Sequence, residues 1–126
     1  MRREARESAF KLIFETLFKE TEEETFIEVT SPLKKEEDKK FCEKIFEEYN
    51  LHKNELDEKI SSHLKNFTLS RVYRIDLALV YMALTEIFYL ETPKAVAINE
   101  ALEISKKYST QESSKFINGL LSSILK

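Results

Sequence analysis

Three arginines crowd the first residues of the chain, at Arg2, Arg3 and Arg6. The apolar residues that follow them recur at helical spacing, so the arginines fall at the start of a helix. A helix start carries partial positive charge and favours acidic residues, which makes three cations there electrostatically unfavourable. Two interpretations are open: a solvated cluster of charges, or a patch that binds an anion such as a phosphate backbone.

The single glycine of the chain, Gly119, lies inside a strongly helical pattern near the C-terminus. Glycine in a helix interior costs about 1 kcal/mol relative to alanine, so its presence here predicts close packing of two helices. Asn99 and Asn118 lie in helical segments beside apolar faces. We expect both amides to be buried and hydrogen-bonded to a neighbouring helix.

Catalytic signatures are missing from the sequence. One glycine cannot build a phosphate-binding loop or a dinucleotide-binding motif, and there is no GxSxG motif or tuned carboxylate pair. His52 and His63 lack the partners of a metal site, and Cys42 continues an apolar helical stripe, which predicts a core residue. The sequence therefore predicts a protein that is not an enzyme and that has no cofactor or metal.

Composition indicates a single helical domain. The chain has 126 residues, 42% of them hydrophobic, and one glycine with two prolines leaves little material for the turns of a β-rich fold. No apolar run reaches the roughly 18 residues of a membrane span, and the charged start does not resemble a signal peptide. With a lone cysteine, these features predict a soluble, cytoplasmic protein with no membrane partner.

Charge is divided unevenly along the chain. The net charge is −3, yet residues 20–58 carry −8 and the remaining residues carry +5. A local basic patch can bind phosphates whatever the total charge of the protein, so the net charge does not exclude a nucleic-acid partner.

Hydrophobic periodicity predicts an all-α fold, a compact bundle of six to seven helices. The expected helices cover 3–18, 34–49, 53–65, 70–90 and 95–108, with a sixth that begins at the capping-box pattern Ser109–Glu112. The segment 70–90 should be the central, most buried helix, and Thr92–Pro93 should end it. Residues 20–34 show no clear period and are expected to form a loop.

Several sequence blocks occur in an order that is typical of one protein family. They are Arg2–Ala9, Phe67–Val72, Ile75–Asp76, Ala83–Ile87, Pro93–Ile104 and Ser114–Leu121. The most specific are the INEA sequence and, about twenty residues later, KFxNG. On these blocks, which span nearly the whole chain, the sequence resembles the NusB family of bacterial transcription antitermination factors.

The resemblance implies one domain over 1–126 with two small subdomains, N-terminal helices over about 1–66 and C-terminal helices over about 67–126. Such proteins are not catalytic. They bind boxA, a short single-stranded RNA element, together with NusE, a small-subunit ribosomal protein. The pair then helps RNA polymerase read through terminators in ribosomal RNA operons.

The resemblance also suggests the RNA-binding residues. Arg2, Arg3 and Arg6 would contact phosphates. Tyr108 matches a family aromatic position that could stack on a base, and Glu112 matches an acidic position that could accept from a base edge. Nearby candidates for backbone contacts are Lys106, Lys107 and Lys115. The ordinary alternatives are lysines on a solvated face and a tyrosine at the edge of the core.

Two further positions are expected to contact NusE. Phe14 matches a position usually held by tyrosine, and Asp76 matches an acidic position, which together would suit a basic protein; core packing is the alternative for Phe14. The chain departs from the family at Val80-Tyr81, where relatives carry Leu-Arg with an arginine associated with RNA. Tyr81 either stacks on RNA instead, or the contact is missing.

Two other functions are open. The chain could be a protein adaptor or homodimer whose RNA site is masked, or the NusB-like domain of an RNA methyltransferase. It ends after a finished helix and has no glycine-rich cofactor loop, so a complete methyltransferase is not expected. An apolar or aromatic residue exposed beside Arg6 would favour the adaptor or homodimer, and a continuous positive patch would favour RNA. The sequence leaves open the oligomeric state, the RNA sequence preference and the role of the acidic segment 20–34.

Overall fold

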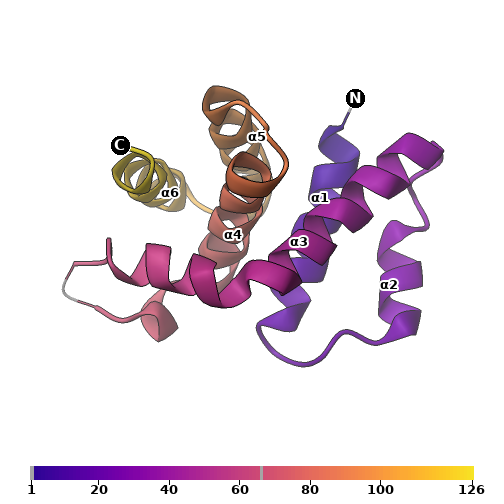
Figure 1. Cartoon of the computed structure of the whole chain (residues 1–126), viewed down its shortest axis with the longest axis horizontal. Coiled ribbons are helices and arrows are strands. Elements are labelled where there is room, and N and C mark those ends of the chain that lie inside the picture. The colour runs from indigo at the N-terminus through magenta and orange to yellow at the C-terminus, as the bar shows by residue number, and fades with distance from the viewer. Residues whose placement is uncertain (1, 66) are drawn as a thin grey trace.

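The structure, a computed structural model, describes residues 2–65 and 67–126 (Figure 1). Within them the chain forms six α-helices and one short 3-10 helix, η1, over Leu69–Arg71. The α-helices are α1 (Arg3–Thr16), α2 (Glu23–Thr30), α3 (Glu36–Ser61), α4 (Arg74–Tyr89), α5 (Lys94–Tyr108) and α6 (Gln111–Ile124). No strand occurs among these residues, and the predicted all-α class is confirmed.

Helix α4 forms the centre of the molecule. Every residue from Asp76 to Glu86 is buried, as expected for a helix that is apolar on nearly all sides. Helices α1, α3, α5 and α6 all pack on it. The predicted central helix is therefore confirmed, although it begins only after η1. It ends before Glu91, which adopts the left-handed conformation with φ of 57°.

The two helices predicted over 34–49 and 53–65 are one long helix, α3, with a kink at His52 (φ −110°, ψ 16°). No buried residue lies between Tyr49 and Leu56, so the hydrophobic pattern is interrupted while the helix continues. The His52 ring stacks on Tyr89 at the end of α4, with centroids 3.7 Å apart and planes 5° apart. The kink thus lies where α3 crosses the end of the central helix.

The prediction of a loop over 20–34 is wrong, because α2 occupies the middle of that segment. None of its residues is fully buried, which explains its weak sequence signal. Phe26 packs against Phe46 of α3 with ring centroids 6.2 Å apart. The Ser8 hydroxyl of α1 donates to the Val29 carbonyl oxygen at 3.2 Å. Contacts with α1 and α3 therefore stabilise α2, a helix that the local sequence pattern does not predict.

The prediction of close packing at Gly119 is also wrong. This residue is exposed on α6, and a Cβ added to it would meet no atom within 4 Å. Asn99 and Asn118 are likewise exposed, which contradicts the expected burial of their amides.

The division into N-terminal and C-terminal helices near residue 66 stays a prediction. Residue 66 itself lies outside the described residues, and α1 and α3 both pack on α4 across the expected boundary. In the described part of the chain, no helix combines the length and the apolar character needed to cross a membrane.

Candidate nucleic-acid interface

Arg6 is buried and forms an ion pair with Glu86 of the central helix. Its guanidinium donates three hydrogen bonds to the Glu86 carboxylate, at 2.8, 2.8 and 3.0 Å. The Thr92 hydroxyl donates to the same carboxylate at 3.1 Å. Only 6% of Arg6 is exposed, so in this structure its guanidinium is held by Glu86 and is not free to meet a phosphate. A buried charge must be paired, and this arginine is fully used in pairing.

Arg3 is also paired, but nearer the surface. It donates to both oxygens of Glu100 on α5, at 3.0 and 2.7 Å, and 42% of its side chain stays exposed. Hydrogen bonds from Arg3, together with its charge, lower the pKa of Glu100 below the usual range. Glu100 belongs to the INEA sequence, so this block links the first helix to the fifth.

Arg2 is exposed, and its guanidinium carbon lies 4.3 Å from the ring centroid of Phe41 on α3. Arg6 approaches the same ring at 5.1 Å. Phe41, the aromatic residue beside Arg6, is therefore half-buried and lies beneath the guanidinium groups of two arginines. Of the three arginines, Arg2 and the outer part of Arg3 are placed to meet an anion.

The corner between α5 and α6 gathers the next group of predicted RNA-binding residues. Lys106 pairs with Glu103 on its own helix at 2.8 Å. Lys107 donates to Glu7 of α1 at 2.9 Å, and the Tyr108 hydroxyl donates to the same carboxylate at 2.7 Å. Although burial acts to raise it, these two hydrogen bonds lower the pKa of Glu7 below its usual value. The corner is thus tied to the first helix by ionised Glu7.

Tyr108 is half-buried at this corner. Its ring packs against Phe10 of α1 with centroids 5.3 Å apart. Lys11 and Lys107 lie within 6 Å of the Tyr108 ring, at 5.9 and 5.5 Å from its centroid. Tyr108 is thus a half-buried ring held between the core and two cations.

Helix α6 begins at this corner and presents Glu112 and Lys115 to solvent. Its N-cap is Thr110, whose hydroxyl accepts from the Ser113 backbone N–H at 3.1 Å. The cap lies one residue later than the predicted box, so Glu112 does not reach back to the cap and its carboxylate stays exposed. Within the described residues, neither Glu112 nor Lys115 forms an ion pair.

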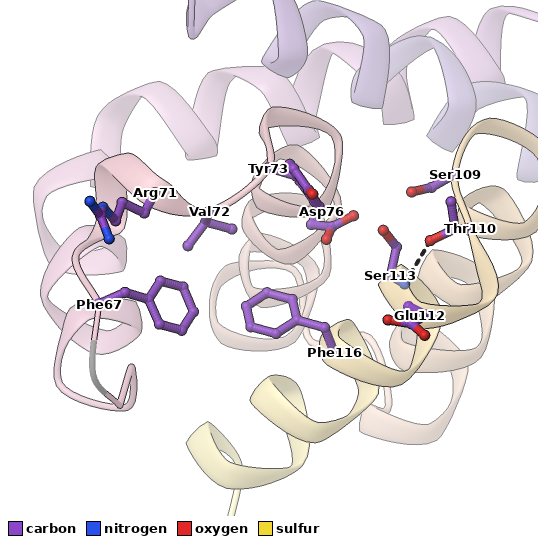
Figure 2. A pocket seen from close by; sticks show the side chains of 10 residues that line it. All are labelled: Phe67, Arg71, Val72, Tyr73, Asp76, Ser109, Thr110, Glu112, Ser113 and Phe116. Atoms are coloured by element: carbon purple, nitrogen blue, oxygen red, sulfur yellow. Dashed lines mark hydrogen bonds between the residues drawn. The ribbon is translucent and has the colours of Figure 1, made fainter.

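A pocket of about 600 Å³ opens between α6 and the segment that leads into α4. We call it the aromatic pocket, and Figure 2 shows the rings of Phe67 and Phe116 facing each other across it. Their centroids lie 6.0 Å apart. Arg71 and Tyr73 line it and are exposed. Glu112 lies at its rim, so the pocket adjoins the α5–α6 corner.

Asp76 lies inside the aromatic pocket. It is 2% exposed, and its Oδ1 has no hydrogen-bond partner among the described residues. Burial raises the pKa of this carboxyl, and the neighbouring Ser113 and Ser109 hydroxyls oppose the shift only in part. An unsatisfied buried acceptor is costly for a fold, and such groups often mark sites that meet a ligand.

Phe14 is half-buried in a row of aromatic residues on α1. Its ring lies 6.2 Å from Phe10 and 5.0 Å from Phe18, which is 62% exposed. Since Phe10 also contacts Tyr108, the aromatic row runs from the exposed Phe18 to the α5–α6 corner. For Phe14, a NusE contact and core packing were the alternatives, and its half-buried position is compatible with both: one side packs in the core and the other borders the surface.

Tyr81 is 1% exposed, so it cannot stack on RNA in this structure, which favours the second alternative, a missing contact. Its hydroxyl donates to the Asp57 carboxylate on α3, and its ring packs against Tyr49 with centroids 5.1 Å apart. The residue that replaces the family arginine therefore holds α4 to α3.

The cysteine and histidines take structural positions. Cys42 is fully buried, and burial raises its pKa to about 12, which confirms the predicted core role. His63 Nδ1 lies 2.9 Å from the Lys59 carbonyl oxygen on its own helix. Across residues 2–65 and 67–126, no cluster of histidine, cysteine or carboxylate side chains is suited to a metal ion.

Sequence reasoning did not select the aromatic pocket. In the sequence, Phe67 stands out only as part of a family block, and Phe116 only as part of a block and of the apolar face of the last helix. Arg71 and Tyr73 carry no signal of their own. The available hint was that Phe67 and Tyr73 are large side chains outside the helical stripes, where solvent exposure is expected.

Comparison with known proteins agrees with this architecture. The sequence model of the NusB family matches residues 3–126. Transcription antitermination protein NusB of Oceanobacillus iheyensis is 38% identical over 125 residues, which covers 98% of each chain. The corresponding protein of Listeria welshimeri is 37% identical over 124 residues, covering 98% of this chain and 94% of the relative.

Solved structures match over nearly the whole chain. T. maritima NusB superposes with a TM-score of 0.90 at 29% identity, covering 98% of this chain and 89% of that one. A chain in the crystal structure of antitermination factors NusB and NusE in complex with dsRNA superposes with a TM-score of 0.89 at 25% identity, covering 98% and 94%. The chain therefore belongs to the NusB family.

Proposed function

We propose that this protein is a transcription antitermination factor that binds boxA-type single-stranded RNA together with NusE. In this role it would help RNA polymerase read through terminators in ribosomal RNA operons, in the cytoplasm and without catalysis. The observation that carries the proposal is the full-length match to NusB proteins, one of them solved in a complex with NusE and dsRNA. The geometry of the described residues supports it independently.

The aromatic pocket and the α5–α6 corner form the RNA-binding face in this proposal. Single-stranded RNA is read by stacking of bases on aromatic rings and by hydrogen bonds to base edges. Phe67 and Phe116 offer ring faces, and Glu112 offers a carboxylate at the rim. Arg71 is exposed beside them and is suited to a phosphate.

The basic residues would contribute unequally. Lys115 and Arg2 are exposed and, among the described residues, form no ion pair, so they can bind phosphates at little cost. Arg3, Lys106 and Lys107 are already paired with carboxylates and would have to share or exchange these partners. Such exchange lowers the net gain, because each carboxylate left behind loses its cation.

Arg6 and Tyr81 act as positioning residues in this proposal. Arg6 fixes α1 on α4 through Glu86, and Tyr81 fixes α4 on α3 through Asp57. They hold the elements that carry the exposed side chains, without touching RNA.

NusE would bind along the aromatic row and toward Asp76. Phe18 supplies an exposed apolar contact next to Phe14, and large aromatic side chains are typical anchors of protein interfaces. The Asp76 carboxylate lacks a partner for Oδ1, which a cationic side chain of a basic protein would supply. Because Asp76 lines the aromatic pocket, a partner that reaches it would meet the RNA-binding face there and could stabilise bound RNA.

The test is fluorescence anisotropy with a labelled boxA RNA and a scrambled RNA of equal length, with and without NusE. We expect selective binding of boxA that NusE strengthens and that added salt weakens. Phe116→Ala and Arg71→Gln should weaken it, and Lys34→Gln, on an exposed residue between α2 and α3, serves as the control. Equal affinity for both RNAs, or no binding together with a stable dimer, would reject the proposal and favour the adaptor or homodimer.

A further inference from the structure

No contact or backbone conformation within the described chain explains why residue 119 is a glycine. It is the single glycine of the protein, it lies in the middle of α6, and a Cβ in its place would meet no atom within 4 Å. Its backbone is helical, so no left-handed conformation requires glycine. Glycine lowers helix stability relative to any ordinary residue. A partner that approaches the helix backbone from outside would explain it.

A groove of about 320 Å³ lies at this position, between α6 and the segment that follows α3. We call it the glycine groove; the residues of interest in its lining are His63, Lys65, Phe67, Lys115, Phe116 and Gly119. Lys115, Gly119 and Ser123 are four residues apart, so they share one face of α6. The groove is therefore a strip along one helix face, open to solvent along its length.

The charged side chains of the glycine groove are of one sign. Two lysines line it, and none of its described lining residues is acidic. Lys65 and Lys115 form no ion pair with any described residue. Unpaired cations beside an open backbone suit a polyanion, whereas a basic protein partner such as NusE would be repelled.

The glycine groove continues the aromatic pocket. Phe67 and Phe116, whose rings Figure 2 shows in the aromatic pocket, also line the groove. Their ring centroids are 6.0 Å apart. A strand of RNA with one base against these rings would therefore reach the groove directly from the pocket.

We propose that the glycine groove binds the sugar–phosphate backbone of RNA nucleotides that flank the boxA element. The inference rests on the proposed function and extends it from the element to its flanks. Lys65 and Lys115 would contact successive phosphates, and the missing side chain at Gly119 would let the backbone lie against α6. This contact is independent of base identity, because it involves phosphate and sugar alone.

The experiment compares three labelled RNAs in the presence of NusE: the boxA element alone, and the same element extended by several nucleotides at the 5′ or the 3′ end. We expect one of the extended RNAs to bind more tightly than the element. For a single strand, the logarithm of the affinity falls with the logarithm of the salt concentration by about 0.7 per phosphate contact. Raising the salt from about 50 to about 200 mM should therefore cost about 2.6-fold in affinity for each such contact. With two lysine contacts, the extended RNA should therefore lose about sevenfold more affinity over this salt range than the boxA element alone.

Two variants separate the groove from the rest of the site. Gly119→Gln should raise the melting temperature by about 2 °C, because glutamine is the better helix former, yet remove the advantage of the extended RNA. Lys65→Gln with Lys115→Gln should remove its extra salt dependence. Lys34→Gln, an exposed lysine outside the groove, should change neither.

Different results would overturn different statements. If the boxA element binds with NusE but neither extension adds affinity, or Gly119→Gln leaves the advantage intact, the groove is not an RNA site and the proposed function stands. If Gly119→Gln weakens NusE binding without RNA, the groove is a protein contact. If no RNA binds under any condition, both proposals fall.

Discussion

Replacing Arg6 with methionine should destabilise the fold by about 3–5 kcal/mol, the usual cost of removing one partner of a buried ion pair. The change removes three hydrogen bonds to Glu86, whose side chain is 0% exposed, and leaves Thr92 as its one remaining side-chain donor among the described residues. For 126 residues, an unfolding entropy of about 2.1 cal/mol/K per residue converts this loss into a melting temperature lower by about 11–19 °C.

Thermal and urea unfolding followed by circular dichroism measures this effect. The control is the double variant Arg6→Met with Glu86→Leu, which removes both charges and should recover most of the loss, because apolar replacement of a buried pair is often neutral. If Arg6 only positions α1, the RNA affinity of the double variant should stay within about twofold of the original, a change in binding free energy of well under about 1 kcal/mol.

Two results would refute this reasoning. A single variant that loses less than about 1 kcal/mol would show that the pair is not buried in solution. Equal loss of RNA affinity in the single and double variants, with the double variant stably folded, would show that Arg6 contacts RNA itself.

Three further outcomes follow from buried groups. Because burial raises the pKa of Asp76 above the ordinary 3.8, the folded state binds its proton more tightly than the unfolded state, so ionisation destabilises the fold. Asp76→Asn should therefore raise the free energy of unfolding, measured in urea, by about 1 kcal/mol at pH 7 and leave it unchanged below about pH 4. The same variant should weaken NusE binding. An equal gain in stability at both pH values would contradict this reasoning. Tyr81→Phe should cost about 1–2 kcal/mol by losing the hydrogen bond to Asp57, with RNA affinity in anisotropy unchanged; a loss of affinity at full folding would argue for a direct contact. Cys42, with its pKa raised to about 12, should resist thiol reagents at pH 8 except at the rate of unfolding, and fast labelling would contradict its burial.

The helices of the bundle could be predicted because their apolar faces are long and periodic. The α2 segment could not, since eight residues with no fully buried side chain give little periodic signal. The kink at His52 shows in the sequence only as a gap in the stripe. Whether a helix stops or bends at such a gap depends on its packing, here on Tyr89 of the central helix.

The candidate site stays a prediction. Arg2, Glu112 and Lys115 are exposed, which is compatible with the roles that the family resemblance suggests. Arg6 could not be assigned, because its partner Glu86 is 80 residues away and the pairing exists only in the folded chain. Residue type indicates what a side chain can bind, while the tertiary structure decides whether it is already occupied.

Amide chemical-shift mapping of the labelled protein, titrated with boxA RNA in the presence of NusE, tests the RNA-binding face most directly. We expect the RNA-dependent shifts to cluster around Phe67, Arg71, Glu112 and Phe116. The amide of Tyr81, inside the core, should stay unshifted. Shifts confined to α2 and the first half of α3, or no shifts at RNA concentrations that saturate a known NusB, would contradict this assignment.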